Sequence, residues 1–234
     1  MKFIPVIDLK DGQVVHAREG KRDQYEPITS QLCKSTDIFQ VIQAFVTTYS
    51  FDTIYIADLN AISLQNNHDP LITKVLLSFP QLMFWVDRGY QCFGEQSTPD
   101  NYIPVLGSES YRDDNILELK HFGNQFVLSL DFSKAESLGA QSLFSSPELW
   151  PKNIIIMTLD RVGSQKGPDL VKLTEFHQRY KNKNFIAAGG VRDQRDLLAL
   201  KNIGIDHVLI ASAFHTGMLS AAEVGKFQTK KYPS

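Results

Sequence analysis

The sequence predicts a (β/α)8 barrel, an α/β fold in which eight parallel strands alternate with helices. Two observations indicate this fold. Eight short apolar runs recur along the 234 residues, and most are followed by a polar turn and a helix-like stretch. The motifs at the strand ends of the first half also reappear in the second half. The length suits one large barrel, so we expect residues 1–234 to form a single domain.

The eight apolar runs are predicted to be strands buried on both faces. They are rich in β-branched and aromatic residues and nearly continuous, which is typical of parallel sheets. In chain order they are Phe3–Ile7, Thr53–Ala57, Leu82–Val86, Tyr102–Leu106, Phe126–Leu130, Asn153–Met157, Phe185–Ala188 and Val208–Ala211. Each run is followed by aspartate, threonine, glycine or serine, residues that favour turns and ligand contacts.

Capping residues predict the starts of the longer helices. The starts fall at Thr36 or Asp37, Asp69-Pro70, Pro168-Asp169, Asp193 and Ser220. The last of these has capping-box spacing, with a glutamate three residues after the serine. The segments after the third and fifth strands contain Gly94, Pro99 and Gly139, so their helices are expected to be short or irregular.

The two halves of the chain carry similar strand ends. The first strand ends in Val6-Ile7-Asp8, and the fifth ends in Ser129-Leu130-Asp131. The third and seventh end in residues 87–89 and 189–192, and the fourth and eighth in 107–110 and 211–214. A twofold repeat of four β/α units closes naturally into eight strands, which favours a barrel built of two similar halves.

Composition excludes several classes of function. The formal net charge of −2 provides no bulk attraction to nucleic acid or to an anionic membrane surface. No apolar run approaches the ~20 residues that span a bilayer, and the N-terminus does not resemble a signal peptide. Cys33 and Cys92 lie far apart, as expected for reduced thiols. We therefore expect a cytoplasmic protein without membrane or nucleic-acid partners.

Asp8 and Asp131 are the first candidates for catalysis, because they end opposite strands and should face each other across the barrel mouth. Two carboxyl groups in different environments can divide the roles of general acid and general base. The alternative is that both cap the following turns. For Asp58 and Asp87 capping and ion pairing are the favoured interpretation.

Small residues after the seventh and eighth strands predict a phosphate site. They are Gly189, Gly190, Ala211 and Ser212. Two neighbouring loops and the N-terminus of a short helix form the usual phosphate site of such barrels, where backbone N–H groups bind the anion without net positive charge. The alternative is that the glycines only serve the turn. The six histidines show no metal-ligand spacing, so no metal site is predicted.

The strand-end motifs resemble the ProFAR isomerase family of histidine biosynthesis. The matching stretches are residues 4–12, 56–61, 128–131, 187–192 and 210–214, in order from the first strand to the eighth. The resemblance implies a (β/α)8 barrel of the ribulose-phosphate-binding type, built of two half-barrels. It also implies an aldose–ketose isomerase that performs an Amadori rearrangement without cofactor or metal, on a substrate with a phosphate at each end.

The same resemblance implies roles for individual residues. Asp8 would be the general base, Asp131 the facing aspartate, and Thr158 would assist at the sugar ring. The small residues after strands seven and eight would hold one phosphate: Gly189, Gly190, Ala211 and Ser212.

Departures from the family pattern fall at the second phosphate site and at the catalytic acid. Residues 86–90 replace a glycine-rich loop, leaving Arg88, with Gly107 and Ser108 after the next strand, as candidate second anion contacts. Where the family usually has an aspartate before a glycine after strand six, this chain has Val162. The acid is either replaced, by Asp160 or Asp131, or lost.

The departures favour a divergent paralogue that acts on a phosphorylated small molecule and keeps one phosphate site. One alternative is an authentic ProFAR isomerase, and another is a barrel that binds a phosphate ligand without catalysis. Relatives in organisms with methanopterin-linked one-carbon metabolism suggest a role there. The oligomeric state and the exact substrate stay open.

Overall fold

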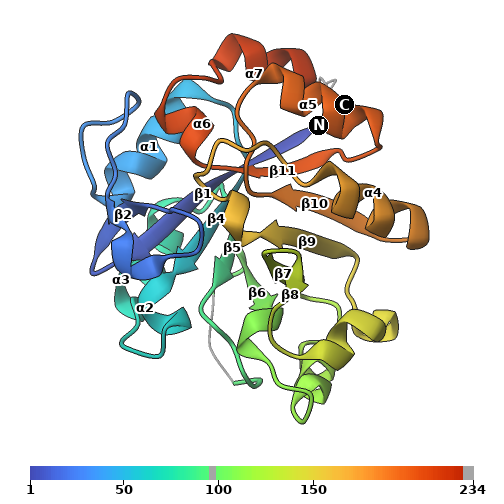
Figure 1. Cartoon of the computed structure of the whole chain (residues 1–234). Helices are drawn as coiled ribbons and strands as arrows, with labels where there is room; N and C mark the ends of the chain where they lie inside the picture. The colour runs from blue at the N-terminus through green and yellow to red at the C-terminus, as the bar shows by residue number, and fades with distance from the viewer. Residues whose placement is uncertain (95–98, 229–234) are drawn as a thin grey trace.

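Eight parallel strands close into a barrel, as the sequence predicts (Figure 1). The computed structural model describes residues 1–94 and 99–228. The barrel strands are β1 (Lys2–Lys10), β4 (Thr53–Asp58), β5 (Met83–Asp87), β6 (Tyr102–Gly107), β7 (Val127–Ser133), β9 (Asn153–Thr158), β10 (Asn184–Ala188) and β11 (His207–Ile210). Each strand pairs with its neighbour in chain order, and β1 also pairs with β11, which closes the barrel.

Three short antiparallel strands lie outside the barrel. Strand β2 (Gln13–His16) folds back on β1, and β3 (Glu26–Pro27) pairs with β2. Strand β8 (Glu136–Ser137) folds back on β7. The β2–β3 hairpin carries the long segment after β1 toward the barrel mouth, so residues far from the strand ends can reach the site.

Helices begin at the expected capping residues. The longer ones are α1 (Ile38–Thr48), α3 (Asp69–Ser78), α4 (Leu170–Arg179), α5 (Gln194–Asn202) and α7 (Ala221–Phe227), and α2 (Leu59–Ile62) and α6 (Ser212–His215) are single turns. The side chains of Asp37, Asp169 and Asp193 accept N-cap hydrogen bonds, and Ser220 forms the predicted capping box. Asp69 is the first residue of α3 rather than its cap, since the cap position belongs to His68.

The segments that follow β6 and β7 contain 3₁₀ turns and no α-helix. The 3₁₀ turns there are η2 (Ser108–Ser110), η3 (Ile116–Phe122), η4 (Gln141–Ser145) and η5 (Pro147–Leu149), and elsewhere the described residues also form η1 (Arg22–Gln24) and η6 (Leu159–Arg161). Between β5 and β6, the described residues 88–94 and 99–101 contain no helix. The irregularity predicted after the fifth strand is confirmed, as is that after the third strand within the described residues 88–94 and 99–101, and it extends to the fourth.

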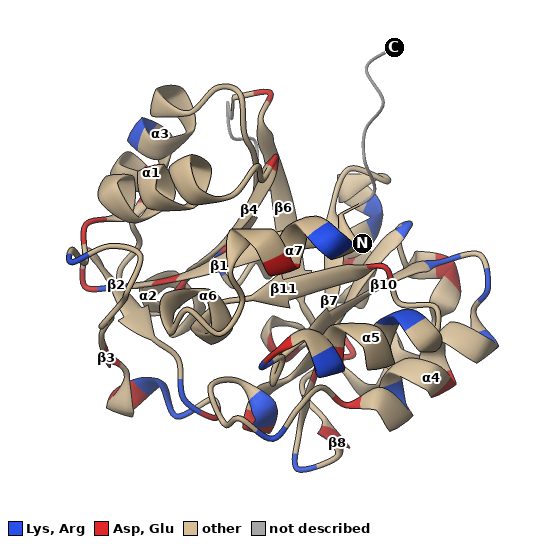
Figure 2. Cartoon of the chain, turned by 90° about the horizontal axis from the view of Figure 1, so that it is seen from above, with Lys and Arg blue, Asp and Glu red and all other residues tan. Residues whose placement is uncertain are grey.

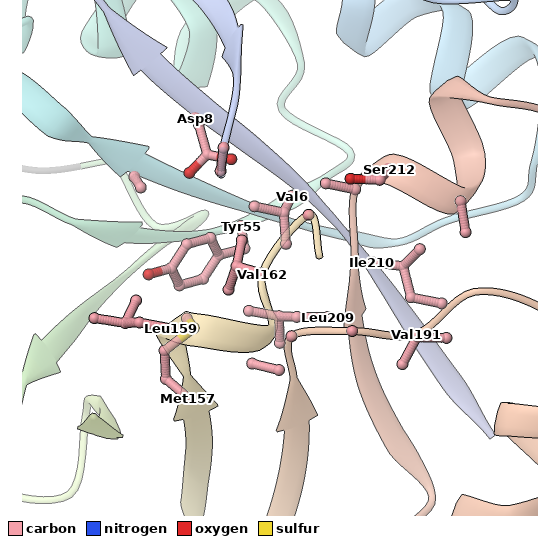
Figure 3. Close-up of a pocket in the computed structure, with 18 of the residues that line it drawn as sticks. Val6, Asp8, Tyr55, Met157, Leu159, Val162, Val191, Leu209, Ile210 and Ser212 are labelled. Carbon is pink, nitrogen blue, oxygen red and sulfur yellow. The ribbon is translucent and has the colours of Figure 1, made fainter. Parts of the chain in front are cut away.

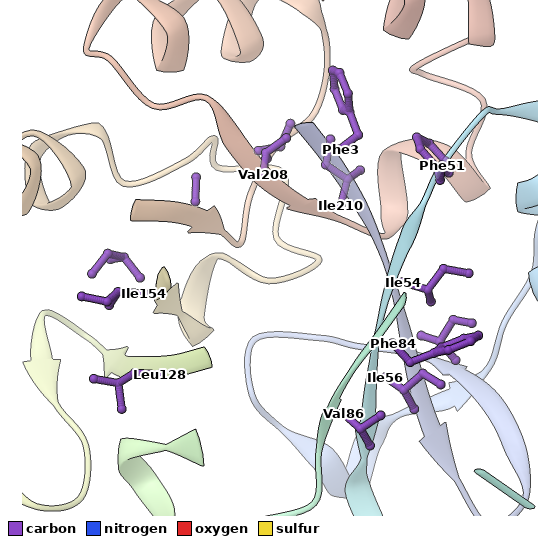
Figure 4. Packing of buried hydrophobic residues seen from close by; sticks show 14 of the residues in the cluster. Phe3, Phe51, Ile54, Ile56, Phe84, Val86, Leu128, Ile154, Val208 and Ile210 are labelled. Carbon is purple, nitrogen blue, oxygen red and sulfur yellow. The ribbon is translucent and has the colours of Figure 1, made fainter. Parts of the chain in front are cut away.

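Alternation along the strands builds two hydrophobic clusters. Residues such as Ile54, Ile56 and Phe84 point outward and pack beneath the helices (Figure 4). Their neighbours, including Tyr55 and Trp85, point into the barrel. Successive side chains of a strand face opposite sides, so the barrel interior and the outer core use alternate residues.

The same alternation sorts the four strand-end aspartates. Asp8, Asp87 and Asp131 share the inward parity of Val6, Trp85 and Ser129, and all three line one cavity. Asp58 follows the outward parity, is fully buried, and accepts hydrogen bonds from the backbone N–H groups of Ala61 and His68. Asp58 is therefore a structural residue, as predicted, whereas the capping interpretation is insufficient for Asp87.

The outer surface carries charges of both signs. Acidic and basic residues are interspersed over the helices and loops that are visible in Figure 2. Among the described residues, no helix combines the length and apolar character needed to cross a membrane.

Candidate active site

A cavity of about 300 Å³ opens at the carboxyl ends of the barrel strands. Two kinds of wall line it. Polar side chains of Asp8 and Tyr55 lie on one side and Ser212 on the other, with Val6, Leu209 and Val162 between them (Figure 3). This position is where barrels of this class carry their active sites, and the size suits a small molecule.

Asp131 also lines the cavity and is almost fully buried. Its carboxylate accepts hydrogen bonds from Ser129 Oγ at 2.6 Å, Ser108 Oγ at 3.1 Å and the backbone N–H of Glu109 at 3.1 Å. Burial, reinforced by the nearby Glu109 carboxylate, nevertheless raises the pKa of Asp131 to about 8. At neutral pH Asp131 is therefore mostly protonated and can donate a proton.

Asp87 is the second buried carboxyl group of this wall. It accepts hydrogen bonds from the backbone N–H of Gly89 at 3.0 Å and from the Tyr55 hydroxyl at 3.3 Å. Burial raises the pKa of Asp87 to about 6, and it also raises the pKa of Tyr55 well above its usual value. A Cβ on Gly107 would lie 3.2 Å from Asp131 Oδ2 and 3.5 Å from Asp87 Oδ2, so this glycine lets both carboxyl groups approach.

Asp8 lies in β1, two residues before its end, and β1 lies opposite β7 in the closed barrel. It is partly accessible through the cavity, and the described residues donate no hydrogen bond to its carboxylate. Burial raises the pKa of Asp8 to about 7, and the positive charge of Arg22 opposes this rise. Asp8 is thus balanced between its charged and neutral forms near neutral pH, which suits a general base.

Arg22 and Glu109 form an ion pair on the same wall. Arg22 comes from η1 in the β2–β3 connection, and Glu109 lies in η2, directly after β6. Both side chains line the cavity, and both are about three-quarters buried, with 28% and 23% of their side-chain surface exposed. The pair joins two segments 87 residues apart across the barrel mouth.

The opposite wall consists of small residues after β10 and β11. Gly189, Gly190, Ala211 and Ser212 all line the cavity, so the structure brings together the four residues predicted to hold a phosphate. In the described part of the chain, no hydrogen bond takes up the N–H group of Gly190 or Ser212. His16 Nε2 lies 3.5 Å from Ser212 Oγ. The helix after β11 has only four residues, so the N–H groups, rather than a helix dipole, would bind an anion.

Gly190→Ala is expected to abolish anion binding at this wall. Gly190 has a φ of +84°, and a Cβ there would lie 2.2 Å from the carbonyl oxygen of Gly167. The substitution must therefore move the loop after β10. Titration with inorganic phosphate measures the effect, with Gly225→Ala as the control because a Cβ at Gly225 meets nothing within 4 Å. Equal phosphate affinity in Gly190→Ala and the wild type would contradict this role.

Thr158 does not fit the expected position. It is 3% exposed but is not among the cavity-lining residues, whereas its neighbours Met157 and Leu159 are. Strand alternation explains the difference, because Met157 takes the inward position in β9 and Thr158 the outward one. A contact between the Thr158 hydroxyl and a ligand in the cavity is not supported.

The candidate second anion contacts are also arranged differently. Arg88 forms an ion pair with Asp69 of α3 and does not line the cavity. Ser108 is fully buried, donates to Asp131 and accepts from its N–H group, and Gly107 accommodates the two carboxyl groups. Arg88 and Ser108 thus contact aspartates of the chain itself, Asp69 and Asp131.

The structure also separates the two candidates for the catalytic acid. Asp160 accepts a hydrogen bond from the backbone N–H of Lys134 at 3.0 Å and does not line the cavity. Asp131 lines it, and burial raises its pKa to about 8. Among the described residues, no group of three or more histidine, cysteine, aspartate or glutamate side chains is arranged to hold a metal ion.

Comparison with known proteins agrees with this architecture. Residues 2–220 match the family described as histidine biosynthesis protein. This chain belongs to that family. The resemblance seen in the strand-end motifs is thereby confirmed.

Individual relatives cover nearly the whole chain at low identity. An uncharacterized protein of Methanocaldococcus jannaschii is 32% identical over 96% of this chain and 97% of its own. Proteins named as phosphoribosyl imidazole-4-carboxamide isomerases are more distant. One from Acetivibrio thermocellus is 25% identical, and one from Clostridium botulinum 24% identical, each over 95% of this chain and 98% of its own. The chain is therefore a divergent member of the family.

Proposed function

We propose that this protein is an isomerase-type enzyme that acts on a small molecule carrying one phosphate. The observation that carries the proposal is the two-sided cavity, with buried carboxyl groups on one wall and, on the other, N–H groups that bind no partner among the described residues. Gly189, Gly190, Ala211 and Ser212 would bind the phosphate. The reacting carbon atoms would then lie between this wall and the aspartates.

Asp8 and Asp131 are suited to proton transfer between neighbouring atoms of the substrate. Asp8, with a pKa of about 7, would remove the proton from the carbon next to a carbonyl or imine group. Asp131, with a pKa of about 8, would donate a proton to the oxygen or nitrogen of that group. Asp8 would then return the proton to the former carbonyl or imine carbon, while Asp131 takes the proton of the neighbouring hydroxyl group. These steps complete an aldose–ketose type rearrangement that needs no cofactor.

The proposed reaction should be fastest between about pH 7 and 8, where Asp8 is mostly ionised and Asp131 mostly protonated. An authentic ProFAR isomerase is less consistent with the site, because Asp87 and Glu109 stand at the wall where a second phosphate would bind. A purely binding barrel is less consistent with the two buried carboxyl groups of Asp87 and Asp131 beside the partly accessible Asp8, because carboxyl groups are costly to bury without a function. The cytoplasmic location and the link to one-carbon metabolism stay predictions.

Two experiments test the proposal. The gene should fail to rescue a histidine auxotroph that lacks the isomerase, while the protein is present and folded. Rescue would favour the alternative that the protein is an authentic ProFAR isomerase. In D₂O, a panel of phosphorylated aldoses and aminoaldoses should include a compound whose proton beside the carbonyl exchanges in the presence of the enzyme. Phosphate binding without exchange on any compound would favour the non-catalytic barrel.

A further inference from the structure

The Arg22–Glu109 ion pair lies where a barrel of two similar halves would have its second phosphate site. Strands β5 and β6 are the third and fourth strands, and β10 and β11 are the seventh and eighth. The loops after β10 and β11 form the small-residue wall, so the equivalent place in the first half lies after β5 and β6. Glu109 is the second residue after β6, and Arg22 reaches it from outside the barrel.

Arg22 has the chemistry of a phosphate ligand, because a guanidinium group presents five donors in a planar fork. Its position in the cavity is supported by the hydrogen bond from Lys10 Nζ to the Arg22 carbonyl oxygen, at 2.8 Å. In the described structure, however, its side-chain hydrogen bond goes to Glu109. The Glu109 carboxylate thus occupies the Arg22 guanidinium group that a second phosphate would need.

Most other charged groups of the cavity lining are acidic, and the exception, Arg192, forms an ion pair with Asp196. Asp87, Asp8 and Asp131 line the same wall, and Tyr55 lies among them. Arg22 lowers the pKa values of Asp8 and Asp87, whereas Glu109 raises those of Asp87 and Asp131. A second phosphate would meet these carboxylates in a partly buried site, where repulsion between like charges is poorly screened.

Resting on the proposed function, we infer that Glu109, through its ion pair with Arg22, is the residue that restricts this site to substrates with a single phosphate. The substrate class is a phosphate monoester whose far end carries no negative charge, such as a hydroxyl or an amine group. Arg22 and Glu109 together close the far wall against a second anion, and Arg22 remains available to bind one once Glu109 is neutral.

Inorganic phosphate is the probe that tests this inference. Calorimetric titration at about pH 6 keeps Asp8 and Asp131 mostly protonated, so that repulsion is weakest. The wild type should bind one phosphate. Glu109→Gln should bind a second one, with an affinity at least about tenfold above the limit that the same titration sets for any second phosphate on the wild type. Adding Arg22→Met to this variant should remove the second phosphate and leave the first.

Controls separate this inference from the proposed function. Glu148→Gln makes the same charge change at an exposed site and should bind one phosphate. Glu109→Ala replaces Glu109→Gln if the latter does not fold, as judged by circular dichroism. No second phosphate in either variant, or a second phosphate that survives Arg22→Met, would overturn the inference. A wild type that binds no phosphate at all would count against the proposed function. The variants would still decide the role of Glu109.

Discussion

Asp8→Asn is expected to lower turnover by about 10² to 10⁴-fold, because an amide cannot act as the general base. The folded protein should nevertheless become more stable. Burial holds the pKa of Asp8 at about 7, so at pH 8 the wild type keeps a charge in a poorly solvated place. Removing that charge should stabilise the fold by about 1 kcal/mol or more, after allowance for the partial exposure of this side chain.

Proton exchange on the active phosphorylated substrate and thermal melting at pH 8 measure the two effects together. Asp23→Asn is the matched control, since Asp23 is exposed in η1 next to Arg22. It should leave both turnover and melting temperature nearly unchanged. Turnover within about threefold of the wild type in Asp8→Asn would remove Asp8 as the base.

The stability of the wild type should fall as the pH rises from about 6.5 to 8.5. Burial raises the pKa values of Asp8 and Asp131 to about 7 and 8 in the folded protein, whereas unfolded aspartates ionise near 3.8. The folded state therefore holds more protons than the unfolded state in this window, and it loses their stabilising effect as they dissociate. The expected loss is about 2 kcal/mol.

This pH window separates the aspartates from the histidines. Burial lowers the pKa of His215 to about 4, which makes stability rise with pH, but only below the ordinary histidine value of 6.5. Chemical denaturation at several pH values measures the slope, and Asp131→Asn should remove most of it. A stability that is flat or rising from pH 6.5 to 8.5 would show that these carboxyl groups are ionised in the folded protein.

Local sequence signals were sufficient for the fold and for bringing the small residues after β10 and β11 to one wall of the cavity. Apolar runs predict strands wherever both faces are buried, and capping residues predict helix starts, because both depend on neighbouring residues only. Gly189, Gly190, Ala211 and Ser212 follow adjacent strands, so the barrel order alone brings them together.

The acidic wall was only partly predictable. Asp8 and Asp131 were recognised because they end opposite strands. Counting alternate residues along each strand would also have placed Tyr55 and Asp87 inward and Thr158 outward. The position of Glu109 could have been predicted, because it directly follows the candidate Ser108 at the end of a strand. That of Arg22 could not, because its contact with Glu109 depends on how the β2–β3 hairpin crosses the barrel mouth.

A crystal structure of the wild type with phosphate tests the central claim most directly. We predict one anion in the cavity, within hydrogen-bond distance of the N–H groups of Gly190 and Ser212, with the Arg22–Glu109 ion pair intact. An anion bound at Arg22 or beside Asp87 in the wild type, or none at Gly190 and Ser212 under saturating phosphate, would contradict a single phosphate site facing an acid–base pair.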